Sequence, residues 1–146
     1  MRITDLLKKE SIDLNGVVTT KKETIEKMTL LMEQGGNVKD LEKYRAGVFA
    51  REEEGTTGIG EGIAIPHAKT DAVSGPGLAA MIIRDGVDYD SLDGEPVHMV
   101  FLIAAPNTED DIHLEVLSRL SMLLMDDNFR ANLMKASTVE EFLGYI

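Results

Sequence analysis

The sequence predicts a three-layer domain of the α/β or α+β class, in which helices cover both faces of a sheet. Apolar residues recur at helical spacing in the first and last thirds of the chain, whereas the middle third holds three short apolar runs bounded by Gly, Pro and Asp. The length of 146 residues, with 43% hydrophobic and 28% charged residues, suits one compact domain spanning 1–146.

Two helices are expected before the sheet. A capping-box pattern at Thr20 opens the first, and a pair of glycines beginning at Gly35 ends it. The second is expected over residues 40–53, because its apolar residues form one stripe. Arg51 lies near the end of this helix, where the chain enters a segment rich in glycine and threonine at residues 55–62.

Helical spacing returns in the last third of the chain. A broad apolar face predicts a helix over residues 110–125, with acidic residues at its start that suit the positive end of the helix dipole. Two shorter helices should follow, and the last begins at a cap formed by Ser137 or Thr138. Between the helical regions, three apolar runs predict strands that are buried on both faces. These runs are residues 63–65, 78–84 and 97–104.

The charge balance narrows the range of partners. The chain has 15 Lys and Arg against 26 Asp and Glu, a net charge of −11. Nucleic-acid binding is therefore not expected, because neutralising phosphates requires a basic surface. The acidic runs at residues 52–54 and 109–111 are interpreted as solvated surface, with attraction of basic protein partners as the alternative.

Cysteine content and hydropathy indicate the compartment. The chain has no cysteine, which excludes thiol catalysis, thiolate metal sites and disulfides within its own sequence. Its first residues lack the pattern of a signal peptide, and its longest apolar run, residues 99–105, is too short to cross a bilayer. These observations predict a soluble, cytoplasmic protein.

Three histidines are the main candidates for chemistry. His98 opens an apolar strand, which favours a packing role. His113 lies on the inward stripe of a helix but in its first turn, where free backbone amides can bind an anion; a satisfied core histidine is the alternative. His67 follows Pro66 at the end of a buried strand, so its imidazole is presented at the edge of the sheet before a loop.

These features together indicate that neutral His67 accepts a phosphoryl group. Phosphoryl transfer passes through a loose transition state, so the protein mainly aligns donor and acceptor and spreads the charge on the phosphoryl oxygens. His113 is expected to orient His67 or to donate to those oxygens, and Arg51 to neutralise them, with a surface ion pair as the alternative for Arg51. The glycine-rich segment is expected to offer a hydroxyl and backbone amides, with an ordinary turn as the alternative. Its candidates for binding the phosphoryl group are Thr56, Thr57 and Gly58.

The motif GIGEGIAIPHAKT at residues 58–70 resembles the active-site signature of a known family. The resemblance extends to ITDLLKKESIDLN near the start, to FARE before the glycine-rich segment, to MVFLIAAP, and to HLEVLSRLS beginning at His113. The sequence is thus similar, over nearly its whole length, to the fructose- and mannitol-type IIA domains of the bacterial phosphoenolpyruvate-dependent sugar phosphotransferase system.

The resemblance implies a fold, partners and site residues. The fold would be an α/β three-layer sandwich, with a mixed five-stranded sheet flanked by helices on both faces. His67 would take a phosphoryl group from the phosphocarrier HPr and pass it to a cysteine of a IIB domain, with His113 and Arg51 in support. No metal or diffusible cofactor is implied, and the membrane would be reached only through the IIC component.

Two alternatives remain open at the level of sequence. A related branch uses the same histidine for nitrogen-linked regulation, as an interaction module whose partner binding depends on phosphorylation; the opening segment and the FLIAAP run favour the transport branch. A metal-dependent hydrolase using the three histidines and some carboxylates is less favoured, because no HExxH pattern occurs. The sequence leaves open the sugar, fusion to IIB or IIC, and the oligomeric state.

Overall fold

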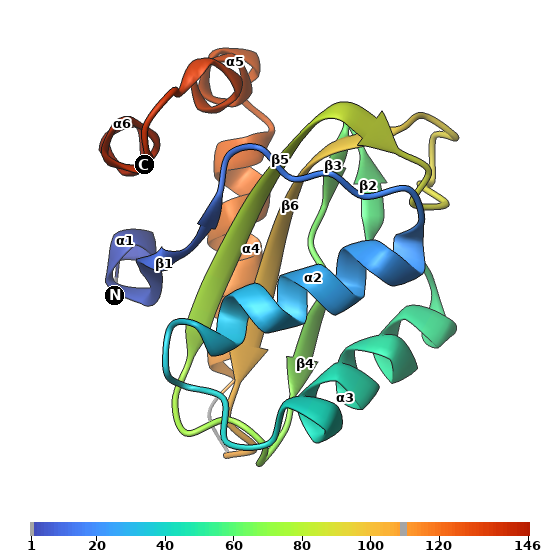
Figure 1. Cartoon of the computed structure of the whole chain (residues 1–146), viewed down its shortest axis with the longest axis vertical. Helices are drawn as coiled ribbons and strands as arrows, with labels where there is room; N and C mark the ends of the chain where they lie inside the picture. Colours follow the sequence, from blue (N-terminus) through green and yellow to red (C-terminus); the bar gives the residue numbers. More distant parts are fainter. Residues whose placement is uncertain (1, 109–110) are drawn as a thin grey trace.

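The computed structural model describes residues 2–108 and 111–146. Within these residues the chain forms six helices and six strands (Figure 1). In chain order they are α1 (Ile3–Leu6), β1 (Leu7–Asp13), α2 (Lys21–Glu33), α3 (Leu41–Glu54), β2 (Gly58–Gly60), β3 (Ile63–Ala64), β4 (His67–Lys69), β5 (Gly77–Val87), β6 (Val97–Ala105), α4 (Ile112–Leu124), α5 (Asp127–Lys135) and α6 (Val139–Gly144).

The strands form one mixed sheet in the order β1-β5-β6-β3-β2, with β4 also paired to β6. β5 and β6 are antiparallel, whereas β1 runs parallel to β5, and both β3 and β4 run parallel to β6. The short β2 pairs antiparallel with β3. The α/β fold class with a mixed sheet is therefore confirmed.

The number of strands differs from the expected five because the strand that follows β2 along the chain is interrupted and counts as β3 and β4. β3 and β4 follow each other along the same side of β6, opposite residues 99–100 and 103–105. Between them, Pro66 has no N–H to donate, and the N–H of Ile65 turns away to donate to Thr57 O at 3.0 Å. The interruption also corrects the expectation of a loop directly after His67, which instead begins β4.

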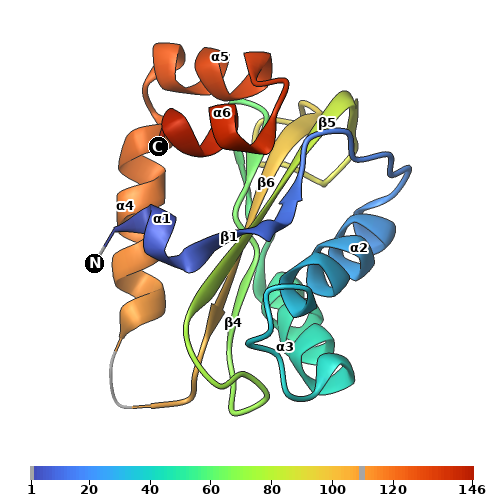
Figure 2. The ribbon, with the colours of Figure 1, turned by 60° about the vertical axis from the view of Figure 1, so that its left-hand side comes forward.

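Helices cover both faces of the sheet, as predicted. Figure 2 shows α2 and α3 on one side and α1, α4, α5 and α6 on the other. Successive side chains of β6 alternate between the two cores, with Val100 and Leu102 in the core under α2 and α3, and Phe101 and Ile103 in the opposite core. Both faces of β6 are thus buried, which explains its uninterrupted apolar sequence.

Side-chain caps begin helices where the sequence predicts them. Thr20 Oγ1 accepts a hydrogen bond from the N–H of Glu23 at 3.0 Å, and Thr138 Oγ1 accepts one from Glu141 at 3.1 Å. Each cap is worth about 1 kcal/mol. The predicted start of the helix at residue 110, and part of the acidic run at 109–111, lie outside the described residues; the observed α4 begins at Ile112.

One acidic residue contradicts the interpretation of residues 52–54 as solvated surface. The Glu52 side chain is only 5% exposed, while its neighbours Glu53 and Glu54 are exposed. Glu52 lies on the inner face of α3 with Tyr44 and Val48, at steps of four residues. Helical geometry therefore places one carboxylate of the run inside the protein.

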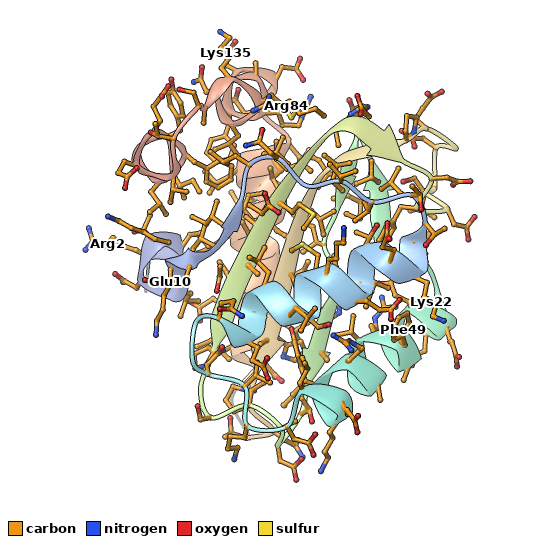
Figure 3. The ribbon with its side chains drawn as sticks, viewed as in Figure 1. Arg2, Glu10, Lys22, Phe49, Arg84 and Lys135 are labelled. Atoms are coloured by element: carbon orange, nitrogen blue, oxygen red, sulfur yellow. The ribbon has the colours of Figure 1, made fainter. Side chains whose placement is uncertain are left out.

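Side chains fill the space between the sheet and the helices, as Figure 3 shows. Arg84, labelled in that view, extends from β5 and donates to the main-chain oxygens of Met134 and Ala136 at the end of α5. These bonds fix the C-terminal helices against the sheet. None of the helices in the described ranges has the length and apolar character needed to cross a membrane.

Candidate active site

An open groove of about 750 Å³ lies along β4, between α3 and α4. Its α3 wall is built from positions 47, 50, 51 and 54, which share one helical face. Its α4 wall is built from residues in the first turns of that helix. The lining residues are Gly47, Ala50, Arg51, Glu54, His67, Ala68, Lys69, His113, Leu114 and Leu117.

His67 is the first residue of β4 and is half-buried in the groove. Its Nδ1 lies 3.1 Å from the main-chain oxygen of Ile65. A carbonyl oxygen can only accept, so in the neutral imidazole Nδ1 carries the proton and Nε2 keeps a free lone pair. The interruption at Pro66 thus places Ile65 O within reach of the ring and selects the tautomer.

His113 lies in the first turn of α4, with its ring centroid 6.4 Å from that of His67. Desolvation lowers the pKa of His113, and the positive charges of His67 and Lys69 lower it further, against an opposing effect of Asp111. The ring is therefore neutral at pH 7. Its Nδ1 is shielded from solvent and has no hydrogen-bond partner among the described residues, so this ring keeps unused hydrogen-bonding capacity.

Arg51 lies in the last turn of α3 and reaches the groove from the layer opposite α4. Its Nη1 donates to Gly55 O at 2.9 Å, which ties the guanidinium to the chain just beyond the helix. A guanidinium has five N–H donors, so this bond leaves others for an anion. Arg51, His67 and His113 are thus brought together, as the sequence predicts.

Lys69 is a cation of the groove that the sequence reasoning missed. It follows His67 by two residues in β4, so both side chains project from the same face of the strand. Its Nζ lies 3.7 Å from Asp111 Oδ1, and its side chain is 26% exposed. If the predicted strand had been extended beyond Pro66, the two-residue period of a strand would have placed Lys69 on the same face as His67.

Residues 5–146 match the family described as "Phosphoenolpyruvate-dependent sugar phosphotransferase system, EIIA 2". The chain belongs to this EIIA family. Over its whole length it is 44% identical to the fructose-specific EIIABC component of Bacillus subtilis, of which it spans only 23%. Over 94% of its length it is 39% identical to the fructose-specific EIIA component of Haloferax volcanii, of which it spans 91%.

This EIIA chain is also similar to solved structures. With nitrogen regulatory protein IIA-Ntr from Neisseria meningitidis it shares 34% identity and a TM-score of 0.90, covering 98% of this chain and 97% of that one. With Escherichia coli enzyme IIAMtl, solved in complex with phosphorylated enzyme IIBMtl, it shares 28% identity and a TM-score of 0.82, covering 96% and 97%. The relatives therefore include sugar-system and nitrogen-regulatory proteins.

The glycine-rich segment of this EIIA chain does not line the groove. Thr57 is buried, and both its N–H and its hydroxyl donate to the carboxylate of Glu52. The N–H of Gly58 donates to Thr56 Oγ1 at 3.1 Å, and that hydroxyl lies 3.3 Å from Tyr89 O. The polar groups of Thr56, Thr57 and Gly58 are thus engaged in internal hydrogen bonds, away from His67.

His98 packs as predicted and lies in a pocket separate from the groove. Its Nδ1 donates to Ile83 O at 3.2 Å, and its ring lies beside Gly62 and Gly86, both with positive φ. In the described ranges, no three side chains of His, Cys, Asp or Glu are placed to hold a metal ion. The three histidines therefore do not assemble into the metal site that a hydrolase would need.

Proposed function

We propose that this EIIA chain is a phosphoryl carrier that forms a phosphohistidine on Nε2 of His67. The observation that carries the proposal is the hydrogen bond from His67 Nδ1 to Ile65 O. It leaves the Nε2 lone pair free to attack phosphorus, and it stabilises the positive charge that the ring gains as the N–P bond forms. The bond from phosphorus to the donor breaks in the same step.

The side chains around His67 suit the binding of a phosphoryl group during its transfer. Arg51 provides a charged, multi-donor group that can bind two oxygens at once. His113, neutral because its pKa is lowered, can donate one N–H to a phosphoryl oxygen without repelling the incoming donor. Positioning and charge stabilisation are what this reaction requires of a protein.

The donor in this proposal is phosphorylated HPr, and the acceptor is a cysteine of a IIB domain. The acceptor thiol must lie outside these 146 residues, because the sequence contains no cysteine. The similar IIAMtl was solved with phosphorylated enzyme IIBMtl as its partner, which supports a IIB domain as the acceptor here. The likeness to two fructose-specific components supports uptake of a fructose-type sugar as the process served.

A second candidate function is regulation by a phosphorylation-dependent interaction module. The TM-score of 0.90 with the nitrogen regulatory IIA-Ntr of Neisseria meningitidis favours it. In this case His67 would still accept a phosphoryl group, but the product would change partner binding instead of passing the group to a IIB cysteine. The two functions therefore differ in the step after phosphorylation.

The test is incubation of the chain with phosphoenolpyruvate, Enzyme I and HPr, followed by intact mass and peptide mapping. We expect one acid-labile phosphoryl group on His67, and its loss on addition of a fructose-type IIB domain. No label on the chain, in a tube where HPr is phosphorylated, would contradict the carrier function. Stable label in the presence of several IIB domains would favour the regulatory function.

A further inference from the structure

A polar cluster surrounds the buried carboxylate of Glu52, the residue that follows Arg51 in α3, and has no part in the proposed transfer. The carboxylate of Glu52 accepts hydrogen bonds from the N–H of Thr57 at 3.1 Å and from its hydroxyl. It also forms an ion pair with Lys21 Nζ at 3.0 Å. We call Lys21, Glu52, Thr57 and Tyr89 the latch, because they join α2, the end of α3, the glycine-rich segment and the β5–β6 connection.

The remaining contacts of the latch determine which hydroxyl donates in each of its hydrogen bonds. The Thr57 hydroxyl gives its one proton to Glu52, so the Tyr89 hydroxyl, 3.4 Å away, is the donor between those two. Burial and the charge of Glu52 raise the pKa of Tyr89, which stays protonated and able to donate. Lys21 Nζ lies 4.8 Å from the centroid of the Tyr89 ring, close enough for a cation–π contact.

Glu52 is the point at which both ends of the turn beyond α3 are attached. Its main-chain oxygen accepts from the N–H of Gly55 at 3.1 Å, and its carboxylate holds Thr57. Gly55, with φ of +154°, lies between these attachments. The main-chain oxygen of Gly55 is the acceptor for Arg51 Nη1 at 2.9 Å. The position of the Arg51 guanidinium is therefore set by a carbonyl whose own position the Glu52 carboxylate helps to fix.

We propose that Glu52 and Thr57 are positioning residues that hold Arg51 in place for phosphoryl transfer at His67. The inference rests on the proposed carrier function. The sequence predicts that the Thr-Gly segment binds the phosphoryl group directly. In this proposal it instead affects the position of Arg51, through Glu52 and the Gly55 carbonyl. A fixed guanidinium matters here because a charge displaced by about 1 Å can lower a transfer rate by up to 100-fold.

The first test compares Glu52→Gln with Glu53→Gln, its exposed neighbour, which undergoes the same charge change outside the latch. We expect Glu52→Gln to slow phosphoryl transfer from HPr by roughly 10- to 100-fold, and Glu53→Gln to match wild type. Circular dichroism and thermal melting identify variants that fail to fold.

A double-mutant cycle separates positioning from general destabilisation. If Glu52 acts through Arg51, then adding Glu52→Gln to an Arg51→Gln chain should slow transfer by less than about twofold more. Multiplication of the two effects would overturn the inference, because Glu52 would then act independently of Arg51. A wild-type rate in either Glu52→Gln or Arg51→Gln would overturn it as well.

Thr57 provides a second pair of variants in case Glu52→Gln does not fold. Thr57→Ser keeps the hydroxyl that donates to Glu52 and should transfer at the wild-type rate, whereas Thr57→Val removes it and should be slowed. Equal rates in these two variants would contradict the inference.

The NMR signal of Arg51 Nε–H provides a readout that requires no phosphoryl group. It should shift or broaden in Thr57→Val and remain unchanged in Glu53→Gln. An unlabelled wild-type chain would overturn the carrier function, whereas an unchanged Arg51 signal in Thr57→Val would overturn the positioning role; the two failures are thus distinguishable.

Discussion

Two histidines lie on or beside β6 with the same backbone hydrogen bond and different surroundings. His67 Nδ1 donates to Ile65 O at 3.1 Å, and His98 Nδ1 donates to Ile83 O at 3.2 Å. Both side chains are half-buried. In the neutral state each ring therefore keeps its proton on Nδ1 and a lone pair on Nε2. By tautomer alone, either could be a nucleophile.

The charged residues around the two rings differ, because cations line the groove of His67 and carboxylates predominate beside His98. Among the described residues, the groove of His67 is lined by Arg51, Lys69 and Glu54, and Lys69 is ion-paired with Asp111. Beside His98, the cation Arg130 is already paired with Asp127 and Glu61. The carboxylates of the two pockets that His98 lines are Glu61, Asp93, Glu95 and Asp127. Under the proposed carrier function, the difference indicates that an acceptor histidine needs cations beside it as well as the correct tautomer, because carboxylates beside the ring would repel a phosphoryl dianion.

The largest effect is expected from a matched pair of histidine variants. His67→Gln should abolish phosphoryl acceptance, because it removes the Nε2 lone pair that the proposed transfer uses, whereas His98→Gln should be labelled like wild type. Intact mass after incubation with phosphoenolpyruvate, Enzyme I and HPr measures both. Full labelling of His67→Gln, or loss of label from a folded His98→Gln, would remove the distinction between the two histidines.

The second largest effect should follow from loss of the guanidinium. Arg51→Gln removes the charge and most donors facing the phosphoryl oxygens, and should slow transfer by about 100-fold, the typical cost of losing one transition-state donor. Arg51→Lys keeps the positive charge but loses the planar guanidinium that can bind two oxygens. Its transfer rate should therefore lie between those of wild type and Arg51→Gln. Single-turnover kinetics with phosphorylated HPr measures the series. A rate for Arg51→Lys as low as that of Arg51→Gln would show that geometry outweighs charge.

Helices α2 to α6 and the central strands β5 and β6 could be predicted from sequence because their signals are local, whereas the four-residue α1 was not expected. Thr20 and Thr138 cap the helices they were expected to cap, and β6 spans the apolar run at 97–104 extended by one residue. β1 was missed, since its sequence LKKESID carries four charged residues and no apolar alternation. What makes it a strand is parallel pairing with β5, which is a tertiary contact.

Part of the candidate site could also be predicted from local sequence signals. His67, His113 and Arg51 each occupy an end of an element, which sequence patterns can locate. Thr57 could not be assigned, because whether its hydroxyl faces a groove or a buried carboxylate depends on how α3 packs. The inward position of Glu52 could have been predicted from its helical spacing with Tyr44 and Val48. It was not, because the run of three glutamates was interpreted as solvated surface.

A smaller effect is expected from the second cation of the groove. Lys69→Met should slow transfer by roughly tenfold, as expected for one charge acting across a partly solvated site. Lys43→Met is the control, because Lys43 forms a 2.6 Å ion pair with Asp71 on the surface and does not line the groove. Transfer rates measured at two salt concentrations should converge for Lys69→Met and wild type as salt rises. Equal rates for the two lysine variants would assign Lys69 a structural role only.

The smallest effect concerns the titration of His113. Its pKa is lowered in the free protein, first by desolvation and then by the positive charges of His67 and Lys69. A histidine whose folded pKa lies below its unfolded value stabilises the fold above that unfolded value, and this contribution is lost as pH falls through the folded pKa. A His113→Gln chain should therefore lose less stability than wild type on acidification from neutral pH toward pH 5, measured by urea unfolding across about pH 5 to 7.5.

Phosphorylation of His67 should reverse the direction of this shift. Phosphorylation places a dianion on the His67 ring, whose centroid lies 6.4 Å from that of His113, so a neutral neighbour of His113 becomes a negative one. The pKa of His113 should then rise, because a nearby negative charge favours the imidazolium form. Carbon-detected NMR titration of the free and phosphorylated chains measures the change, with His98 as the internal control that should not move. An unchanged His113 pKa would place the phosphoryl group away from α4 and leave Arg51 and Lys69 as its neighbours.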